Sequence, residues 1–417
     1  MNASDTQDAI ARVHRGEWGR LVASLAARFG DLNVAEEAAA EAFAIAVERW
    51  PSTGLPPNPG AWLATTATRK AIDHIRRERN REQKHRAAQM TSGHTDPAQG
   101  WDVIRDDRLR LIFTCCHPAL PMDARVALTL RLVSGLTVAE IARAFLVSEA
   151  AMAQRITRAK TKIKTARIPY RVPVARDLPA RVSGVLAVLF LVFNEGYLPT
   201  SADNDAVRPD LSEEAIRLTR LTRALLPCDD EVAGLLALML LSEARRPARV
   251  SSAGVLVALG EQDRGAWDKD LVAEGHQLVR LCLKAAAAGA TPGRYQILAA
   301  INAVHTSARD IRQTDWSQIL ALYNQLVNVD ASPVVALNRT VALAEVEGPR
   351  VALAAADRLQ GTLTGYHAFH ATRADLLRRL GRDEEARDAY EAAIKVAGNT
   401  AEIALLEQRR DQLESVV

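Results

Sequence analysis

Apolar residues recur along this chain at intervals of three and four positions, which is the spacing of one face of an α-helix. Ala, Leu, Arg and Glu dominate the periodic segments, while Gly and Pro cluster in the short breaks between them. The pattern predicts an all-α protein, with two small helical domains followed by a longer C-terminal block of α-helical repeats.

The breaks predict three folded blocks and one linker. The first block covers residues 1–82, a polar stretch at 83–100 has the composition of a flexible linker, and the second block covers 101–172. The Pro-punctuated segment IPYRVPVARDLP then leads into the third block, residues 173–417. A chain of 417 residues is long enough for two or three such domains, each with its own core.

The segment LTVAEIARAFLVSEAAMAQRITRAKTKI in the second block has the layout of a helix-turn-helix. Thr137 and Glu140 form a capping box for a short helix, and Ser148 caps a longer helix after a tight turn. From Arg155 to Arg171 the chain has seven Lys or Arg and no acid, a density suited to DNA phosphates. The alternative is a solvated basic helix on an ordinary helical hairpin.

The first block combines an acidic helix with a basic one. In LNVAEEAAAEAFAIAVERW we expect Phe43, Ala46 and Val47 to face inward, and the glutamates to face outward toward a protein. The basic helix follows Trp62, and between residues 69 and 86 it has eight Lys or Arg against three acids. Its predicted inner face holds Ala67, Ala71, Ile72 and Ile75. Taken singly, both outer faces are also explained as solvated surface, and Trp62 as a core residue.

The whole-chain net charge of +3 conceals an asymmetry between the two halves. Residues 1–172 have 26 Lys and Arg against 18 Asp and Glu, a net of +8, which leaves a net of −5 for residues 173–417. This division suggests a nucleic-acid partner for the first part and a protein-facing or regulatory role for the second.

Several classes of protein are not expected. The chain has no apolar run typical of a membrane span and no signal-peptide pattern, so we expect a cytoplasmic protein. It also lacks a P-loop, a dinucleotide-binding turn, a zinc-protease motif and a nucleophile elbow, so no enzyme activity or cofactor is expected. Cys115, Cys116 and His117 invite a thiol or metal interpretation, but core packing is favoured, because adjacent cysteines cannot both bind one tetrahedral ion without strain.

The order of these features resembles the extracytoplasmic-function (ECF) class of sigma-70 family sigma factors, over about residues 10–170. The features are an acidic helix, a Trp-Leu helix that runs into AIDHIRRERNR, a flexible linker, and a helix-turn-helix with a basic tail. The chain departs from the family pattern at Ala40, where Gln is frequent, and at Arg69, where Asn is frequent; the second change alters the available hydrogen-bond donors and acceptors.

The resemblance implies three sets of contact residues and two partners, core RNA polymerase and promoter DNA. Residues implied to recognise the −35 element are Ser148, Glu149, Gln154, Arg155, Arg158, Lys160 and Lys162. Residues implied to contact the −10 element are Arg69, Lys70, His74, Arg76, Arg77, Arg79 and Asn80. Residues implied to contact the polymerase are Glu36, Glu37 and Glu41. No catalytic or metal-binding residue is implied.

The C-terminal block also resembles a known group, the sigma factors with a tetratricopeptide (TPR)-like extension. Its segment VLFLVFNEGYLPTS carries part of that likeness, and Asn194–Tyr197 is either a contact surface or a helix end closed by Gly196. Asp210 and Glu213 predict a capping box. Two helix–turn–helix units are predicted, with turns at Gly348 and Gly381, and the second places Ala386, Tyr390 and Ala393 at TPR-like offsets.

Three interpretations therefore remain. The first is a sigma factor whose C-terminal domain modulates its activity, with a possible contact to the sigma domains. The second is a helix-turn-helix regulator that acts outside the polymerase holoenzyme and uses the repeats as a sensor. The third is a helical scaffold whose basic faces have no partner.

Overall fold

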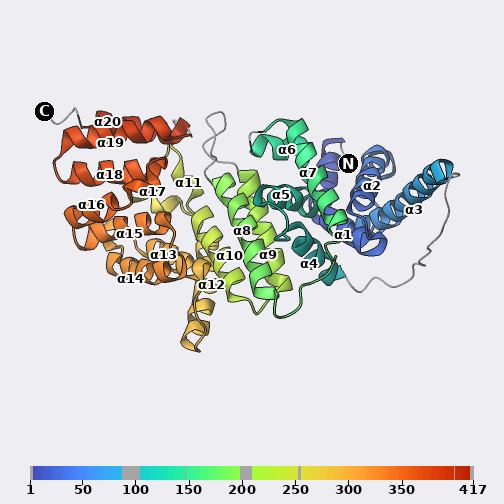
Figure 1. Ribbon diagram of the computed structural model, residues 1–417, viewed down its shortest axis with the longest axis horizontal. Coiled ribbons are helices and arrows are strands. Elements are labelled where there is room, and N and C mark those ends of the chain that lie inside the picture. Colours follow the sequence, from blue (N-terminus) through green and yellow to red (C-terminus); the bar gives the residue numbers. More distant parts are fainter. Residues whose placement is uncertain are drawn as a thin grey trace. The chain divides into compact units, whose positions relative to one another are not determined.

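The fold is seen in a computed structural model, which describes residues 3–86, 104–145, 147–197, 209–251, 255–398 and 400–413. The chain divides into two compact units, residues 1–191 and 192–417. Across the described residues the only β interaction is an isolated antiparallel bridge between Val250 and Leu256. The prediction of an all-α protein is confirmed (Figure 1).

The first unit contains the helices coloured from blue to green in Figure 1. In chain order they are α1 (Ala3–Phe29), α2 (Leu32–Thr53), α3 (Pro59–Arg86), α4 (Ile104–Cys115), α5 (Met122–Leu128), the π-helical turn η2 (Thr129–Ser134), α6 (Val138–Ala144), α7 (Glu149–Thr165) and α8 (Leu178–Tyr197). The boundary between the two units lies within α8. The predicted linker lies largely outside the described residues, because 83–86 belong to α3 and 87–103 are not described.

Helix α1 organises the first unit. It contacts α2, α3, α4 and η2. Trp18, Leu21, Val22 and Leu25 are buried at spacings of three and four, as expected of a helix that packs along one face. The segments on the two sides of the linker therefore share one core.

The second unit is a longer succession of helices. They are α9 (Pro209–Leu225), α10 (Asp230–Glu243), α11 (Arg246–Arg249), η3 (Leu259–Glu261), η4 (Arg264–Ala266), α12 (Lys269–Ala287), α13 (Arg294–Ser307), η5 (Ile311–Gln313), α14 (Trp316–Val329), α15 (Pro333–Val346), α16 (Pro349–Asp357), α17 (Gln360–Leu363), α18 (His367–Arg379), α19 (Asp383–Val396) and α20 (Thr400–Asp411). Every residue of α10 from Val232 to Glu243 is buried, because α9, α12 and α13 all pack on it.

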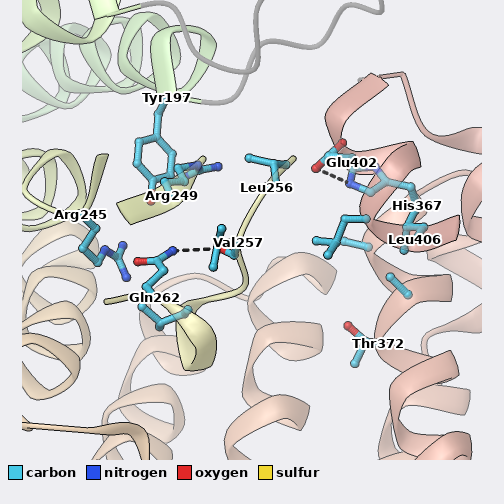
Figure 2. Close-up of a pocket in the computed structure, with 14 residues that line it drawn as sticks. Tyr197, Arg245, Arg249, Leu256, Val257, Gln262, His367, Thr372, Glu402 and Leu406 are labelled. Carbon is cyan, nitrogen blue, oxygen red and sulfur yellow. Dashed lines mark hydrogen bonds and ion pairs between the residues drawn. The ribbon is translucent and has the colours of Figure 1, made fainter. Parts of the chain in front are cut away.

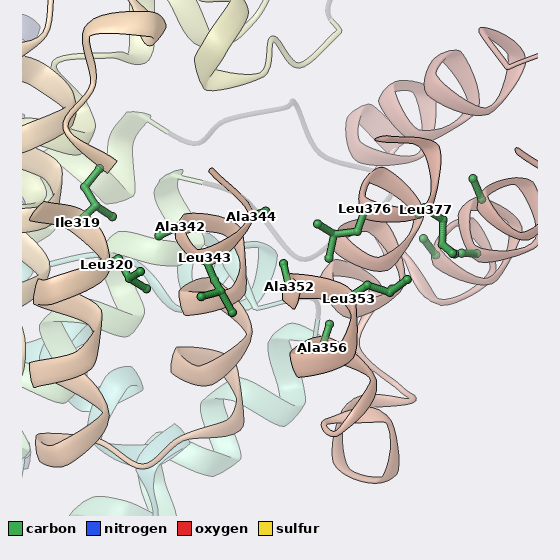
Figure 3. Close-up of a cluster of buried hydrophobic side chains, with 14 of the residues drawn as sticks. Ile319, Leu320, Ala342, Leu343, Ala344, Ala352, Leu353, Ala356, Leu376 and Leu377 are labelled. Carbon is green, nitrogen blue, oxygen red and sulfur yellow. The ribbon is translucent and has the colours of Figure 1, made fainter. Parts of the chain in front are cut away.

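From α13 onward each long helix packs against the next along the chain, apart from the short α17. Figure 3 shows Leu320 of α14, Leu343 of α15, Leu353 of α16 and Leu376 of α18, which belong to one hydrophobic cluster. Helix pairs joined by short turns occur where predicted, at α15–α16 and α18–α19. Gly348 and Gly381 have positive φ angles of 91° and 71°, which a glycine adopts without the steric cost of a Cβ.

One detail of the C-terminal prediction is wrong, and another lies outside the described side chains. The second is the predicted capping residue Asp210: α9 is described from Pro209, and the Asp210 side chain is not among those that the structure describes. Helix α8 continues through Gly196 to Tyr197 and does not close at the glycine. The Tyr197 ring stacks on Phe193, one turn earlier, with 5.6 Å between ring centroids.

Helix α8 is the one helix in the described residues that is long and apolar enough to cross a membrane, with a mean hydropathy of 1.5 over its most apolar window. Among its buried side chains are Val185, Val188, Val192 and Phe193. This burial is also typical of a core helix, and a single helix of this composition is weak support for a membrane span.

Candidate nucleic-acid interface

The predicted helix-turn-helix is present as α6 and α7. At the start of α6, Thr137 Oγ1 accepts a hydrogen bond from the Glu140 amide at 3.1 Å, and the Glu140 carboxylate accepts one from the Thr137 amide at 2.7 Å. Ser148 caps α7 by accepting a hydrogen bond from the Ala151 amide at 3.2 Å. Ile141 on α6 and Met152 on α7 are both fully buried. The local sequence therefore sets both helix starts and the contact between the helices.

Helix α7 has one exposed polar stripe. Gln154, Arg158 and Lys162 follow each other at intervals of four, so they lie on one face, and all three are exposed. Ser148 and Glu149 are exposed at the N-terminal end of the same helix. This stripe can present hydrogen-bond donors and two positive charges to a DNA groove and its phosphates.

Arg155 and Lys160, the other two predicted DNA contacts on α7, bond to protein carboxylates. Arg155 Nε lies 3.2 Å from an oxygen of Asp123, which is on α5. Lys160 forms an ion pair with Glu36 on α2, and the Lys160 side chain is only 12% exposed. The prediction treated the seven residues alike, whereas the fold leaves five of them exposed.

The basic helix α3 is divided in the same way. Arg69, Arg76 and Arg77 are exposed. Lys70 Nζ lies 3.0 Å from a carboxylate oxygen of Glu41, and His74 Nε2 lies 3.3 Å from one of Glu37, so the basic helix is bonded to the acidic helix beside it. The side chains of Arg79 and Asn80 lie outside the described residues.

Three predicted side-chain directions in the first unit are wrong. Glu36 was expected to face outward but is buried, at 8% exposure. Val47 and Ile72 were expected to face inward but are 56% and 42% exposed. Helical spacing alone does not fix these directions, because α2 and α3 contact more than one neighbouring element. Glu37 and Glu41 remain accessible on α2, with 55% and 44% of their side chains exposed.

The contact between α1, α2 and η2 joins the two halves of the first unit. Arg131 on η2 donates from Nε to Glu36 at 2.5 Å, and the Trp18 indole donates to the Arg131 carbonyl at 3.1 Å. At Gly19 on α1 a Cβ would lie 2.4 Å from the Val133 carbonyl oxygen, so only glycine permits this approach. Arg131 was not predicted as a functional residue, although a lone arginine in the apolar stretch VALTLRLV was a signal in the sequence.

A further ion pair joins α7 to the N-terminus of α2. Lys164 Nζ on α7 donates to Asp31 at 3.0 Å, and Asp31 also caps α2 through the Asn33 amide. Partial burial by itself would raise the pKa of Asp31, but the hydrogen bonds from Lys164 and from the Asn33 amide outweigh it and hold that pKa below its usual value. The Asp31 carboxylate is therefore stabilised in its charged form.

The Cys115–His117 segment packs as predicted. Cys115 and Cys116 are buried and reduced, and Cys116 Sγ lies 3.5 Å from Thr129 Oγ1. Burial raises the pKa of the Cys116 thiol to about 11, which favours the protonated thiol. In the part of the chain that the structure describes, no three His, Cys, Asp or Glu side chains are grouped to hold a metal ion.

Comparison with known proteins assigns both halves of this arrangement. Residues 16–81, which span much of α1 to α3, match the family Sigma-70 region 2, and residues 110–163, which include the helix-turn-helix, match Sigma-70, region 4. The chain belongs to the sigma-70 family. Its regions 2 and 4 are those of an RNA polymerase sigma factor, a transcription initiation factor and not an enzyme, and they imply core RNA polymerase and promoter DNA as partners.

The C-terminal extension of this sigma-70 family member is shared with other proteins. Residues 181–283 match a family of unknown function, DUF6596. An uncharacterized protein of Rhizobium meliloti (strain 1021) is 44% identical over 391 residues, which cover 92% of this chain and 91% of that protein. The likeness therefore includes the extension as well as the two sigma regions.

Proposed function

We propose that this sigma factor is of the ECF type and directs core RNA polymerase to promoters with −35 and −10 elements. In this proposal α7 recognises the −35 element through Gln154, Arg158 and Lys162, with Ser148 and Glu149 at its N-terminal end. Helix α3 contacts the −10 element, with Arg69, Arg76 and Arg77 as the exposed cations. The match to region 4, together with the exposed stripe on α7, is the observation that carries the proposal.

Two recognition helices on separate regions give the protein a physical advantage. Each helix makes only a few contacts, but once one element is bound, the other helix is held at a high effective concentration near its own element. The spacing between the elements then contributes to specificity. We propose residues 1–82 and 101–172 as the two regions and 83–100 as the segment that joins them, of which α3 takes up the residues to Arg86.

The polymerase-facing surface proposed for α2 centres on Glu37 and Glu41. Their carboxylates are accessible, and they bond to His74 and Lys70, which are partly exposed. Glu36 belongs to the same proposed surface only in a conformation that separates it from Arg131 and Lys160. Likewise, Arg155 and Lys160 can contact DNA phosphates only after their ion pairs with Asp123 and Glu36 break.

The test is run-off transcription with purified core polymerase, the full chain and a promoter identified by transcript mapping. We expect promoter-specific transcripts that fall about tenfold or more for Arg158→Ala, because a base or phosphate contact to arginine contributes roughly 1–3 kcal/mol. Arg176→Ala is the matched control, since Arg176 is exposed outside the helix-turn-helix and the change removes the same charge. Equal loss in both variants would contradict the assignment of α7.

The same experiment separates a sigma factor from a regulator that acts outside the holoenzyme. A sigma factor forms a stable complex with core polymerase and needs no other initiation factor. If the purified chain shifts promoter DNA in the absence of core enzyme and yields no transcript with it, the regulator is the correct interpretation. A chain with neither activity would be the scaffold.

We also propose that the C-terminal unit is TPR-like, modulates the sigma activity and acts in the cytoplasm, with a contact to the sigma regions as one route. Support comes from the successive helix pairs α15–α16 and α18–α19 and from Ala386, Tyr390 and Ala393, which are all buried on α19. A chain that ends at Tyr197 should differ from the full chain in transcript yield, with thermal unfolding as the check on its folding. Identical yields would contradict modulation.

A further inference from the structure

The second unit contains a cavity that no part of the sigma function uses. It has a volume of about 380 Å³, within the range of small-molecule sites. Its walls come from the end of α8, from α11 and the loop that follows it, and from α18 and α20 (Figure 2). The DUF6596 match ends at residue 283, so the α18 and α20 wall is outside that match.

One wall of the cavity carries two arginines. The guanidinium of Arg249 lies over the Tyr197 ring, with Cζ 3.5 Å from the ring centroid, which fixes its plane. Arg245 lines the same wall and donates one hydrogen bond, to Asn302 at 2.9 Å. Guanidinium groups that are already stacked or hydrogen-bonded lose little side-chain conformational entropy when they bind a planar anion. This wall is therefore preorganised for such an anion.

Three buried polar atoms of the residues that form this wall have no hydrogen-bond partner among the described residues. They are Nε of Arg245, Nε of Arg249 and Oε1 of Gln262. The Gln262 amide nitrogen donates a hydrogen bond to the Val257 carbonyl at 3.0 Å. The Gln262 side-chain oxygen lies on the same side of the cavity as Arg245 (Figure 2). Because buried polar atoms in folded proteins are nearly always hydrogen-bonded, these three atoms mark this side of the cavity as polar and incompletely paired.

The charges around the cavity favour an anion at this wall. Burial lowers the pKa of Arg249, and the like charge of Arg245 lowers it further. Tyr197, Glu402 and Glu243 act in the opposite direction but do not outweigh these two effects. Of the two acids, Glu402 lies 3.2 Å from His367, and Glu243 lies 2.9 Å from Arg246. A bound anion would stabilise the Arg245 and Arg249 guanidinium groups, which form no ion pair within the described part of the chain.

Apart from His367, Thr372 and Glu402, the rest of the cavity is lined by apolar side chains. Leu256 and Leu406 line it and are each only 8% exposed, and Ala371 lines it from α18. In Figure 2 the Leu256 and Leu406 side chains lie away from the Arg245 and Gln262 wall. A ligand that fits both parts has an anionic group at one end and an apolar body at the other.

We propose that this cavity is a binding site for a small organic carboxylate. The carboxylate accepts hydrogen bonds from the guanidinium N–H groups of Arg245 and Arg249. The apolar body of the ligand lies against Leu256 and Leu406. A planar carboxylate matches the donor geometry of a guanidinium better than a spherical anion does. The proposal concerns binding alone and stands whether or not the chain acts as a sigma factor.

The experiment is calorimetric titration of the full chain, in buffer free of phosphate and acetate, with a series of alkyl and phenylalkyl carboxylates from butyrate to decanoate and 4-phenylbutyrate. We expect saturable one-site binding and a raised melting temperature, with the corresponding neutral amides binding at least tenfold more weakly. Inorganic phosphate is the third probe. Tight binding of phosphate with no carboxylate binding would overturn the carboxylate assignment, and equal binding of acids and amides would overturn the anion site.

Variants locate the site and separate it from a purely structural role. Arg245→Gln and Arg249→Gln should each weaken carboxylate binding at least tenfold, whereas Arg220→Gln, an exposed arginine that pairs with Glu274, should not. Gln262→Glu places a carboxylate beside the two arginines, so it should raise the melting temperature of the unliganded chain and abolish carboxylate binding. A destabilised Gln262→Glu chain that still binds carboxylate would contradict the proposal.

Discussion

Arg131 Nε lies 2.5 Å from a carboxylate oxygen of Glu36, although the two residues are 95 positions apart. One belongs to the region 4 match and the other to the region 2 match. Lys160 reaches the second oxygen of the same carboxylate. All three side chains are less than a fifth exposed, so this cluster is a buried, paired set of charges between the two sigma regions.

Removal of the Glu36 charge should destabilise the first unit. In Glu36→Gln, Arg131 and Lys160 lose the carboxylate that they share, although both side chains are mostly buried. The loss of one partner of a buried pair costs about 3–5 kcal/mol. Urea unfolding followed by circular dichroism would measure the loss. Glu48→Gln is the control, because Glu48 is an exposed glutamate on the same helix. Equal midpoints for the two variants would show that the pairs contribute nothing to stability.

Two glycines on α1 should respond to alanine with opposite signs. Gly19→Ala brings a Cβ within 2.4 Å of the Val133 carbonyl oxygen, so α1 must move away from η2, at a cost of roughly 1–3 kcal/mol. Gly16→Ala has open space at its Cβ and should stabilise the helix by up to about 1 kcal/mol. Thermal unfolding of both variants checks the pair. A stabilising Gly19→Ala would mean that α1 and η2 do not pack this closely.

Lys160 and Lys162 should separate stability from DNA binding. Lys162 is exposed on the stripe of α7, so Lys162→Ala should leave the unfolding midpoint unchanged and reduce the salt dependence of promoter binding by about one unit in log–log slope. Lys160→Ala should destabilise the chain by roughly 1–3 kcal/mol, because Glu36 loses a buried partner. Holoenzyme binding to promoter DNA at several salt concentrations, together with urea unfolding, measures both. The assignment of faces is wrong if the two variants exchange these effects.

Glu231 should make the stability of the second unit depend on pH. Its carboxylate accepts a hydrogen bond from the Tyr295 amide at 3.0 Å. Burial, together with the negative charge of Asp229, raises the pKa of Glu231 to about 7. The Tyr295 amide and Arg294 lower this pKa, but burial outweighs them. A raised pKa means that the folded state holds the proton more tightly. The resulting stability is present below the usual pKa of glutamate and is lost as pH rises toward 7.

The matched variant for this effect is Glu231→Gln, whose amide oxygen can still accept from Tyr295. Its stability relative to the natural chain should increase between pH 5 and pH 7.5, by up to about 3 kcal/mol, since 1.36 kcal/mol corresponds to one pKa unit. Urea unfolding at four pH values across this range tests the expectation. A constant difference between the two proteins would show that Glu231 does not titrate there.

Much of the fold follows from local sequence. The capping box at Thr137 and Glu140, the Ser148 cap and the turn glycines Gly348 and Gly381 form where the sequence predicts them, because each depends on neighbours within a few residues.

The errors arise where more distant parts of the chain decide. Glu36 sits on the polar side of its helix by composition and is nevertheless buried, because Arg131 and Lys160 come from segments 95 and 124 positions later. The pocket wall of Arg245, Arg249 and Gln262 had no sequence signal at all, since its unpartnered atoms are defined only by what surrounds them.

The sequence by itself determined the helical class, the order of the two sigma regions and the residue types proposed to face DNA, because helical periodicity, caps and motif spacing are local properties. Only the tertiary structure decided which of those charged residues are accessible. Gln154, Arg158 and Lys162 remain exposed on α7, while Lys160 is bonded to Glu36. The physical reason is that the exposure and charge environment of a side chain depend on every element packed around it, and those elements come from distant parts of the chain.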